Sequence, residues 1–497
     1  MKRTYRTLSL MLSLLLLSAC ESGQDNGKSP EQTANESPST LQTAEQTAEE
    51  DPLAQYDPNI PAADYGGRPF RFIYGESAVE PNYDLCADSI TGEPLNDAVY
   101  ERNQYINEKY NIEIQYESMG YGDTRTQVAK TVQAGDSTYD VMINNCVYST
   151  ELASEGHLYQ LNDFPYLDFS KPYWDAGSLA GSSFDGKNFF AHSDMNFHAK
   201  SATPCVLFNK KLAKTYQIPD LYATVEAGNW TFDLMSSYIS QVTADTDGDG
   251  VITQYDTLGF ISNTFCVDSL LSATGYQTIR KDENDIPVLN MQTEQYYNII
   301  EKILNLLSEE NGAFLCDRYN DVDREEVPKA VMEADRALFW ICNFKDVSLM
   351  RNMNSDFGIL PLPKLDENQA EYRTHYQRNI GGANSIPVTV SDPELCGMVL
   401  EDMAYQSMRT VKPMYFDVLL QGKVLRDDES LVSLNIIYNS YYSDFGFFTT
   451  SVNIDPLGDL RTYAEENRRD YVSRIERKQK AYTKYLEKFI NAYQENT

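Results

Sequence analysis

The chain has 497 residues, of which 74 are acidic and 41 are basic, and its formal net charge at neutral pH is −33. A surface this acidic repels nucleic acid and anionic lipid, so we expect no nucleic-acid partner and a neutral or cationic ligand. The length exceeds that of one typical domain, so two lobes are the default expectation.

The N-terminus has the features of an export signal. Three basic residues precede the apolar run Leu8–Leu17, which ends in the sequence LSAC at Cys20. This order is typical of a secretory signal peptide. The LSAC sequence resembles the lipobox of bacterial lipoprotein signals, and the resemblance implies cleavage before Cys20 and attachment of lipid to it. The alternative is an ordinary secretory signal with a chance cysteine. We predict a signal peptide over residues 1–19 and a lipid anchor at Cys20, on the extracellular face of the cell membrane.

The segment after Cys20 differs in composition from the rest of the chain. Residues 21–64 are rich in Glu, Gln, Ser, Thr and Asn and contain no Phe or Trp. Such a composition does not bury enough apolar surface to fold. We therefore predict a lipidated cysteine and disordered tether over residues 20–64, and a folded body that starts near Tyr65.

Strand-like and helix-like segments alternate in the first part of the body. The predicted strands are residues 68–76, 111–118 and 139–145, and the predicted helices are residues 94–110 and 124–135. This alternation predicts a parallel sheet with right-handed crossovers. Ligands of such sheets lie beyond the carboxyl ends of the strands, so the loops after Gly75 and Asn144 are the first candidates for a site.

The second part of the body begins near Ser201. It contains a predicted strand and helix over residues 204–222, helices over residues 230–244 and 297–312, and strands over residues 336–344 and 356–363. The tail from about Tyr438 is predicted to be mainly helical. Gly381 and Gly382 interrupt an apolar segment, which favours a hinge or a close backbone approach.

Four segments resemble one protein family in the same order along the chain. They are residues 93–114, 206–235, 245–260 and 356–374. These segments resemble the extracellular solute-binding lipoproteins of bacterial ABC importers, family 1, which are relatives of maltose-binding protein. The resemblance implies an α/β fold: a two-lobed, periplasmic-binding-protein-like clamp in which each lobe is a mainly parallel sheet flanked by helices.

The same resemblance implies the organisation and the partners. Lobe 1 is expected to comprise residues 65–200 plus 380–435, and lobe 2 residues 201–379 plus 436–497. A carbohydrate, in particular an oligosaccharide, is expected to bind between the lobes of a monomer that delivers it to the permease subunits of an importer.

The sequence DTDGDGVITQYD, from Asp245 to Asp256, has the ligand order of an EF-hand calcium loop. The predicted ligands are Asp245, Asp247, Asp249, the Val251 carbonyl, Thr253 and Asp256. The following sequence, TLGFISN, is strand-like, and the chain has no partner loop. We therefore predict one structural Ca²⁺ and no calcium switch. The alternative is an acidic turn that binds no ion.

No catalytic motif stands out. The chain lacks H-E-x-x-H and G-x-S-x-G sequences, so we predict a binding protein and no enzyme. The alternative is a cell-surface carbohydrate-active enzyme that uses a pair of carboxyl groups, for which 74 acidic residues leave room. Turnover of an oligosaccharide by the pure protein would separate the two functions.

Sugar sites combine aromatic rings with carboxylates and amides. The predicted ligand contacts, all near strand ends or expected lobe junctions, are Trp340, Asn343, Glu76, Asn144, Asn145, Arg378, Asn379, Tyr441 and Tyr442. Among the other tryptophans, Trp230 is predicted to lie in the core, and Trp174 either in the core or at the edge of lobe 1.

Overall fold

The structure is a computed structural model that describes residues 51–76, 84–377, 380, 382–418, 427–450 and 453–496. The chain divides into two units, Met1–Asp51 and Pro52–Thr497, and every helix and strand of the described residues belongs to the second. The predicted signal peptide, Cys20 and the tether up to residue 50 lie outside the described residues.

The packed body begins at Pro52, which is earlier than the predicted start at Tyr65. Ile60 is buried in a hydrophobic cluster of the first sheet. The backbone N–H groups of Ala63 and Tyr65 donate to the carbonyls of Lys109 and Tyr110, at 3.1 and 3.0 Å. One buried side chain and these backbone bonds attach a segment whose composition alone predicts disorder.

The first sheet is mainly parallel, as predicted. Its strand order is β11-β3-β1-β2, with bounds Ala383–Ser385, Val141–Asn144, Arg68–Glu76 and Ile112–Gly120. Strand β1 pairs in parallel with β2 and β3, and β11 is antiparallel to β3. Phe70, Phe72 and Tyr74 pack in one cluster, whereas Ile73 packs in another. Both faces of β1 are therefore buried, as is usual for a parallel sheet.

The second sheet is mixed, so the prediction of a mainly parallel sheet is wrong for this half of the body. Its strand order is β10-β4-β9-β5-β8, with bounds Phe357–Leu360, Pro204–Asn209, Ala337–Asn343, Leu258–Ser262 and Ala313–Leu315. Strand β5 is parallel to β8 and β9, but β4 is antiparallel to β9 and β10. Strand direction depends on where each connection crosses the sheet, and hydrophobic pattern does not specify that.

Local sequence signals set the helix ends. Helix α2 (Pro94–Tyr110) begins with a proline and ends at Asn111, whose φ is 45°. Helix α9 (Phe232–Val242) is capped by Thr231, which accepts from the backbone of Leu234. Side-chain caps of this kind satisfy N–H groups that have no partner within the helix.

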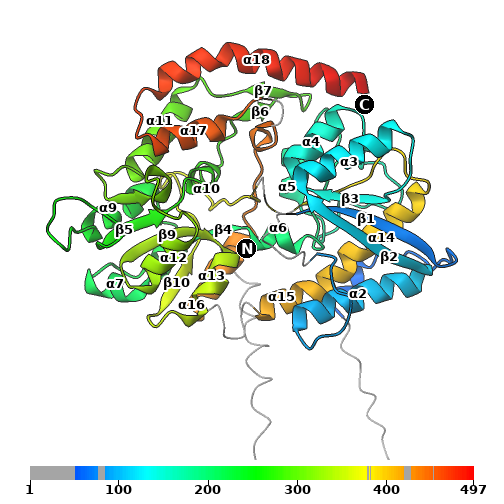
Figure 1. Ribbon diagram of the computed structural model, residues 1–497, viewed down its shortest axis with the longest axis horizontal. Helices are drawn as coiled ribbons and strands as arrows, with labels where there is room; N and C mark the ends of the chain where they lie inside the picture. Colours follow the sequence, from blue (N-terminus) through cyan, green and yellow to red (C-terminus); the bar gives the residue numbers. More distant parts are fainter. Residues whose placement is uncertain are drawn as a thin grey trace, which may run out of the picture. The chain divides into compact units, whose positions relative to one another are not determined.

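The other α-helices of the described residues surround the two sheets (Figure 1). They are α3 (Tyr121–Gln133), α4 (Cys146–Ser154), α5 (Ala176–Ser182), α6 (Phe197–Ser201), α7 (Lys210–Thr215), α8 (Leu221–Glu226), α10 (Cys266–Ala273), α11 (Glu294–Leu306), α12 (Glu326–Glu333), α13 (Phe344–Leu349), α14 (Pro393–Gln406), α15 (Lys412–Val418), α16 (Glu429–Tyr438), α17 (Pro456–Glu465) and α18 (Tyr471–Asn496). A short hairpin is formed by β6 (Ile279–Lys281) and β7 (Pro287–Leu289).

The chain passes from the first sheet to the second between β3 and β4, and returns between β10 and β11. The two connections and a later segment are joined by direct contacts. Thr203 and Tyr441 share a hydrogen bond of 2.5 Å between their hydroxyl groups. The ring of Tyr376 stacks on that of Tyr441, with centroids 4.2 Å apart. Gly382 allows a close backbone approach, because a Cβ there would lie 2.6 Å from the Ile143 side chain.

Helix α18 contacts both halves of the body (Figure 1). Tyr482 donates to Asp459 of α17 at 2.7 Å, on the side of the second sheet. At the other end, Tyr493 stacks on Phe184, and the Asn496 side chain donates to the Ser154 carbonyl at the end of α4. The sequence-based division assigned residues 436–497 to lobe 2. Helix α18 also contacts α4, which that division assigned to lobe 1. Among the described residues, no helix is long and apolar enough to span a bilayer.

The core contains the tryptophan that the sequence placed there. Trp230 is fully buried and donates from its indole N–H to the Pro361 carbonyl at 2.9 Å, which confirms that prediction. Trp174 is also buried, so it belongs to the core. All seven cysteines after Cys20 are free thiols, and six of them are buried.

Glu401 of α14 is a fully buried carboxyl group. One oxygen accepts from the Tyr173 hydroxyl at 2.6 Å, and the other accepts from the Trp174 indole at 2.9 Å. Burial raises the pKa of Glu401 to about 7, and these hydrogen bonds only partly oppose the rise.

This raised pKa predicts a pH-dependent loss of stability. The unfolded chain ionises Glu401 at lower pH than the folded chain does, so the free energy of unfolding falls as the pH rises from about 4.5 to about 7. Glu401→Gln keeps an acceptor for Trp174 and gives Tyr173 a donor. We expect the free energy of unfolding of this variant to exceed that of the parent protein by on the order of 2–3 kcal/mol at neutral pH, and to equal it near pH 4. Thermal melts across this range measure the difference, and a constant offset at every pH would contradict the assignment.

Candidate functional site

A cavity of approximately 970 Å³ lies among the loops at the ends of both sheets. Its lining includes residues that follow β1, β2 and β3 of the first sheet, and residues at the ends of β4, β5 and β9 of the second. The volume is at the upper end of the range of small-molecule sites in proteins. A ligand in this cavity therefore contacts both halves of the body.

The first wall is built from the carboxyl ends of parallel strands. Glu76 is the last residue of β1, and Tyr121 follows the end of β2 as the first residue of α3. Asn145 follows β3 and caps α4 by accepting from the backbone of Tyr148 at 3.1 Å. This is the edge where α/β sheets bind ligands, and Glu76 and Asn145 both line the cavity there.

The second wall centres on the end of β9. Trp340 and Asn343 both line the cavity, and Asn343 caps α13 in a capping box with Asp346. The backbone N–H of Asn343 donates to Asp346 at 2.9 Å, and Gln377 donates to the Asn343 side chain at 3.5 Å. These bonds hold the Asn343 amide at the cavity and link this wall to the segment that returns to the first sheet.

Trp340 is only 6% exposed and belongs to a buried cluster of the second sheet. Trp340 was predicted from the sequence as a ligand contact, but its burial gives it a structural role as well. Replacing it with Ala would damage the fold, because removing a buried tryptophan from a central strand costs about 3–5 kcal/mol of stability. Trp340 is therefore chiefly a core residue, and only one edge of its side chain lines the cavity.

The cavity contains more acidic than basic groups. Four carboxyl groups and two cations line it, namely Glu76, Glu325, Glu326, Asp346, Arg324 and Lys345. The Arg324 guanidinium lies over the Phe265 ring, 5.5 Å from its centroid, and 3.4 Å from Glu325. Burial raises the pKa of Asp346 and lowers that of Lys345. Since carboxyl groups occur on both walls, an anionic ligand would be repelled from either side.

Several predicted contacts lie elsewhere. Asn144 is fully buried, and its amide donates to the Tyr121 carbonyl at 3.1 Å, so it supports the wall from behind. Tyr441 lines a second cavity, and Tyr442 lines neither cavity. Arg378 and Asn379 lie outside the described residues.

The second cavity has a volume of about 360 Å³ and lies beside the connections between the sheets. Tyr376 and Tyr441 form part of its lining, together with Asp194, Lys200 and Lys412. Both lysines form ion pairs with Asp194. These charged groups thus satisfy one another within the protein.

Sequence reasoning missed several residues of the large cavity, including Tyr121, Tyr148, Phe265, Arg324 and Gln377. Tyr121 and Tyr148 had a usable signal, because each lies within a few residues of a strand end in the first half of the body. Arg324 and Gln377 had none, since their approach depends on how distant segments fold together.

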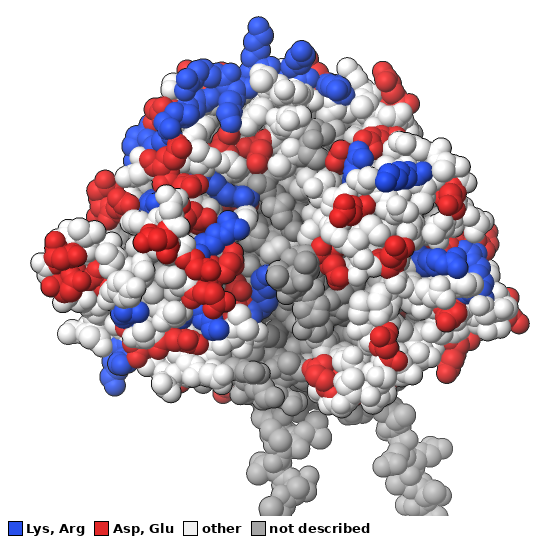
Figure 2. Space-filling view, viewed as in Figure 1, with Lys and Arg blue, Asp and Glu red and all other residues white. Residues whose placement is uncertain are grey.

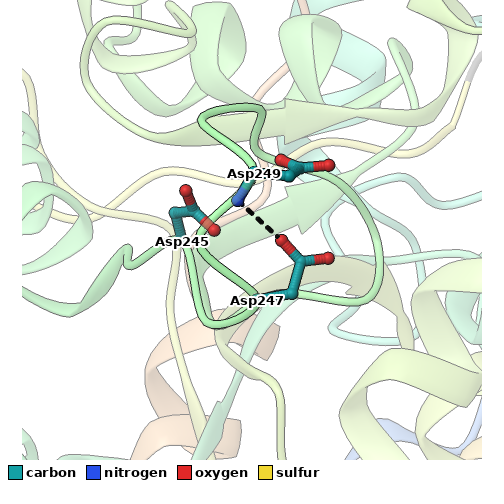
Figure 3. A group of neighbouring side chains, drawn as sticks. All are labelled: Asp245, Asp247 and Asp249. Carbon is teal, nitrogen blue, oxygen red and sulfur yellow. Dashed lines mark hydrogen bonds between the residues drawn. The ribbon is translucent and has the colours of Figure 1, made fainter.

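The aspartate-rich loop joins α9 to β5. Figure 3 shows the side chains of Asp245, Asp247 and Asp249 on this loop. Asp245, Asp247 and Asp249 each place a carboxylate oxygen within 4.8 Å of the others. Two oxygens on one Ca²⁺ lie no more than about 5 Å apart, so this donor set fits the ion. Gly248 and Gly250 have φ of 79° and 86°, and the backbone N–H of each donates to Asp245. Strand β5 leaves the loop where an EF-hand would have a helix, as predicted.

Asp256 stands outside this group of three carboxylates. It is buried, and its two oxygens accept four hydrogen bonds from the backbone and side chains of Thr246 and Thr253. These bonds lower the pKa of Asp256 to about 2. In this geometry Asp256 closes the base of the loop, and the predicted ligand Thr253 is one of its donors.

A family of known proteins matches part of this chain. Residues 88–300 match the family model of bacterial extracellular solute-binding proteins. Among curated protein sequences, none matches this chain significantly.

Solved structures with similar folds cover most of the chain. UgpB from Mycobacterium tuberculosis, in complex with glycerophosphocholine, has 14% identity and a TM-score of 0.56, and the match covers 86% of this chain and 100% of that one. A cyclo/maltodextrin-binding protein complexed with maltotetraose has 13% identity and a TM-score of 0.53, with 87% and 98% covered. A solute-binding protein from Thermotoga lettingae bound with α-D-tagatose has 13% identity and a TM-score of 0.50, with 86% and 100% covered. The chain therefore has the mixed α/β fold of these binding proteins, and its residues 88–300 match the bacterial extracellular solute-binding family.

Proposed function

We propose that this protein is a surface-anchored substrate-binding protein that captures a carbohydrate between its two halves and delivers it to an ABC importer. The observation that supports this most strongly is the cavity of approximately 970 Å³, whose walls come from both sheets. The match over residues 88–300 supports a solute-binding role outside the cell. Catalysis is not part of the proposal.

The lining suits an uncharged polyhydroxylated ligand. Tyr121, Tyr148 and Phe265 offer ring surface for the apolar face of a sugar, and the edge of Trp340 adds to it. The amides of Asn145, Asn263, Asn343 and Gln377 offer donors and acceptors for hydroxyl groups. The excess of carboxyl groups favours a neutral sugar over an acidic one. Two of the similar structures were solved with maltotetraose and with tagatose, which is consistent with this choice.

Closure follows from the division of the site. Each sheet supplies one wall, so a ligand that touches both walls binds the closed arrangement better than the open one. A shift from about 1:99 to 99:1 requires roughly 5.5 kcal/mol of differential affinity. The direct contacts of Thr203, Tyr376 and Tyr441 keep the connections together while the walls move. An importer then has a shape by which to distinguish loaded protein from empty protein.

The location and the ion complete the proposal. Cys20 would anchor the chain to the outer face of the cell membrane by lipid, followed by a flexible tether. The carboxylates of Asp245, Asp247 and Asp249 would hold one Ca²⁺ with a structural role, since no residue of their loop lines either cavity. The full donor set predicted from the sequence includes Val251, Thr253 and Asp256.

A panel of neutral oligosaccharides, with uronate-containing ones beside them, tests the binding function. A ligand at a hundred times its Kd raises the free energy of unfolding by roughly 2.7 kcal/mol, which a thermal shift detects. We expect a neutral oligosaccharide to bind and the uronates to bind at least about tenfold more weakly. Asn145→Ser keeps the cap of α4 but removes the amide from the cavity, so it should weaken binding by about tenfold.

Asn209→Ser is the matched control, because Asn209 caps α7 in the same way and lines neither cavity. Equal loss of binding in both variants would contradict the assignment of the cavity. Cleavage of the bound oligosaccharide would instead establish the carbohydrate-active enzyme.

Chelation tests the calcium proposal. We expect EGTA to lower the melting temperature of the parent protein, and millimolar Ca²⁺ to restore it, because a loop with this donor set suits a Kd on the order of 10⁻⁴–10⁻³ M. Asp247→Asn with Asp249→Asn should lower the melting temperature and remove the response. Asp366→Asn, in another exposed turn, is the control that should keep it. A parent melting curve unmoved by either reagent would refute a bound ion.

A further inference from the structure

The C-terminal segment reverses the charge of the protein. Residues 468–496 contain eight basic and four acidic residues, whereas the whole chain has 41 basic and 74 acidic residues. Figure 2 shows Lys and Arg side chains gathered along the upper edge of the body, where α18 lies in Figure 1. This helix therefore presents a local surface unlike the one that the total charge predicts.

The basic residues of this segment differ in their partners. Arg468, Arg474 and Lys478 form ion pairs with nearby carboxylates. By contrast, five exposed residues of the segment have no carboxylate within 4.0 Å in the described part of the chain. One of them, Arg469, donates to the Asn305 side chain and the Leu304 carbonyl of α11. The other four are Arg477, Lys480, Lys484 and Lys488. We refer to these four residues as the basic stripe.

The basic stripe faces directly away from the body. The buried residues of α18 are Ile475, Tyr482, Leu486, Phe489 and Tyr493, which repeat at helical spacing on one face. At about 3.6 residues per turn, the four residues of the stripe lie on the opposite face, in a single row. Their charges are therefore available to a flat partner that approaches the helix from outside.

Two further exposed side chains of α18 are apolar, and they lie on the two flanks of the helix rather than in the row itself. Tyr485 is 39% exposed and Val472 is 37% exposed. Glu476 and Glu487 border one edge of the stripe, so the excess of positive charge is local to the row itself. Lysines together with an exposed aromatic ring are typical of surfaces that lie at the headgroup level of a bilayer.

We propose that the outer face of α18 docks on the phosphate-bearing headgroups of an anionic membrane surface. Charge complementarity supports this occupant, and the predicted lipid anchor at Cys20 keeps the membrane within reach of the body. A polybasic surface adds electrostatic affinity for anionic lipid to the attachment that an acyl anchor provides. The remaining acidic charge does not prevent docking, because repulsion is screened beyond about 8 Å at physiological ionic strength. Docking would hold the body in one orientation above the bilayer.

Vesicle cosedimentation tests this proposal on residues 21–497, which include the entire compact unit Pro52–Thr497 and lack the residue to be lipidated. We expect binding to phosphatidylcholine vesicles that contain phosphatidylglycerol, and no binding to phosphatidylcholine alone. Binding should fall at least about tenfold between ~0.1 M and ~1 M salt, where the Debye length shrinks from about 10 to 3 Å. Lys480→Gln with Lys484→Gln and Lys488→Gln should reduce it by at least about tenfold at low salt.

Lys130→Gln with Lys214→Gln and Lys329→Gln removes the same charge from other helices and should leave vesicle binding unchanged. Equal loss in the two triple variants, or equal binding to neutral and anionic vesicles, would overturn the proposal. The proposal would also be overturned if the protein did not bind vesicles and cells that carry the triple lysine variant of the basic stripe took up sugar more slowly. That result would indicate an acidic protein partner. Sugar binding is measured separately, so failure here leaves the proposed transport function unaffected.

Discussion

The hydrogen bond between Thr203 and Tyr441, with the Tyr376–Tyr441 stack beside it, connects the segments on which the architecture depends. Each sheet has its own buried strands, but neither sheet alone encloses the large cavity. The segments around these three residues hold the two walls facing one another. A site divided in this way can respond to its ligand by moving one wall, which a site within one rigid sheet cannot do.

Electrostatics separates the surfaces of the molecule by role. The cavity has an excess of carboxyl groups, which disfavours anions, and the acidic loop at Asp245 concentrates negative charge where a divalent cation fits. The outer face of α18 has the opposite sign. The total charge has the sign of the cavity and of the acidic loop but not that of the outer face of α18. This local difference persists because interactions between exposed charges decay within about a Debye length.

Local pattern predicted much of the fold. The bounds of β1 and α2 agree with the segments expected from burial periodicity and from the proline at the start of α2. The rule that ligands lie at strand ends located Glu76 and Asn145 at the cavity. It did not separate Asn145 from Asn144, which is fully buried and donates to the Tyr121 carbonyl. The mixed direction of the second sheet and the position of Tyr441 depend on contacts between distant segments, which no local pattern encodes.

The position of the ligand tests the central claim most directly. A crystal structure with the tightest oligosaccharide of the panel should show density in the cavity between Asn145 and Asn343, in contact with residues of both walls. Hydroxyl groups should lie within hydrogen-bonding distance of at least one amide from each wall. Density confined to one wall, or in the smaller cavity beside Tyr441, would contradict the account.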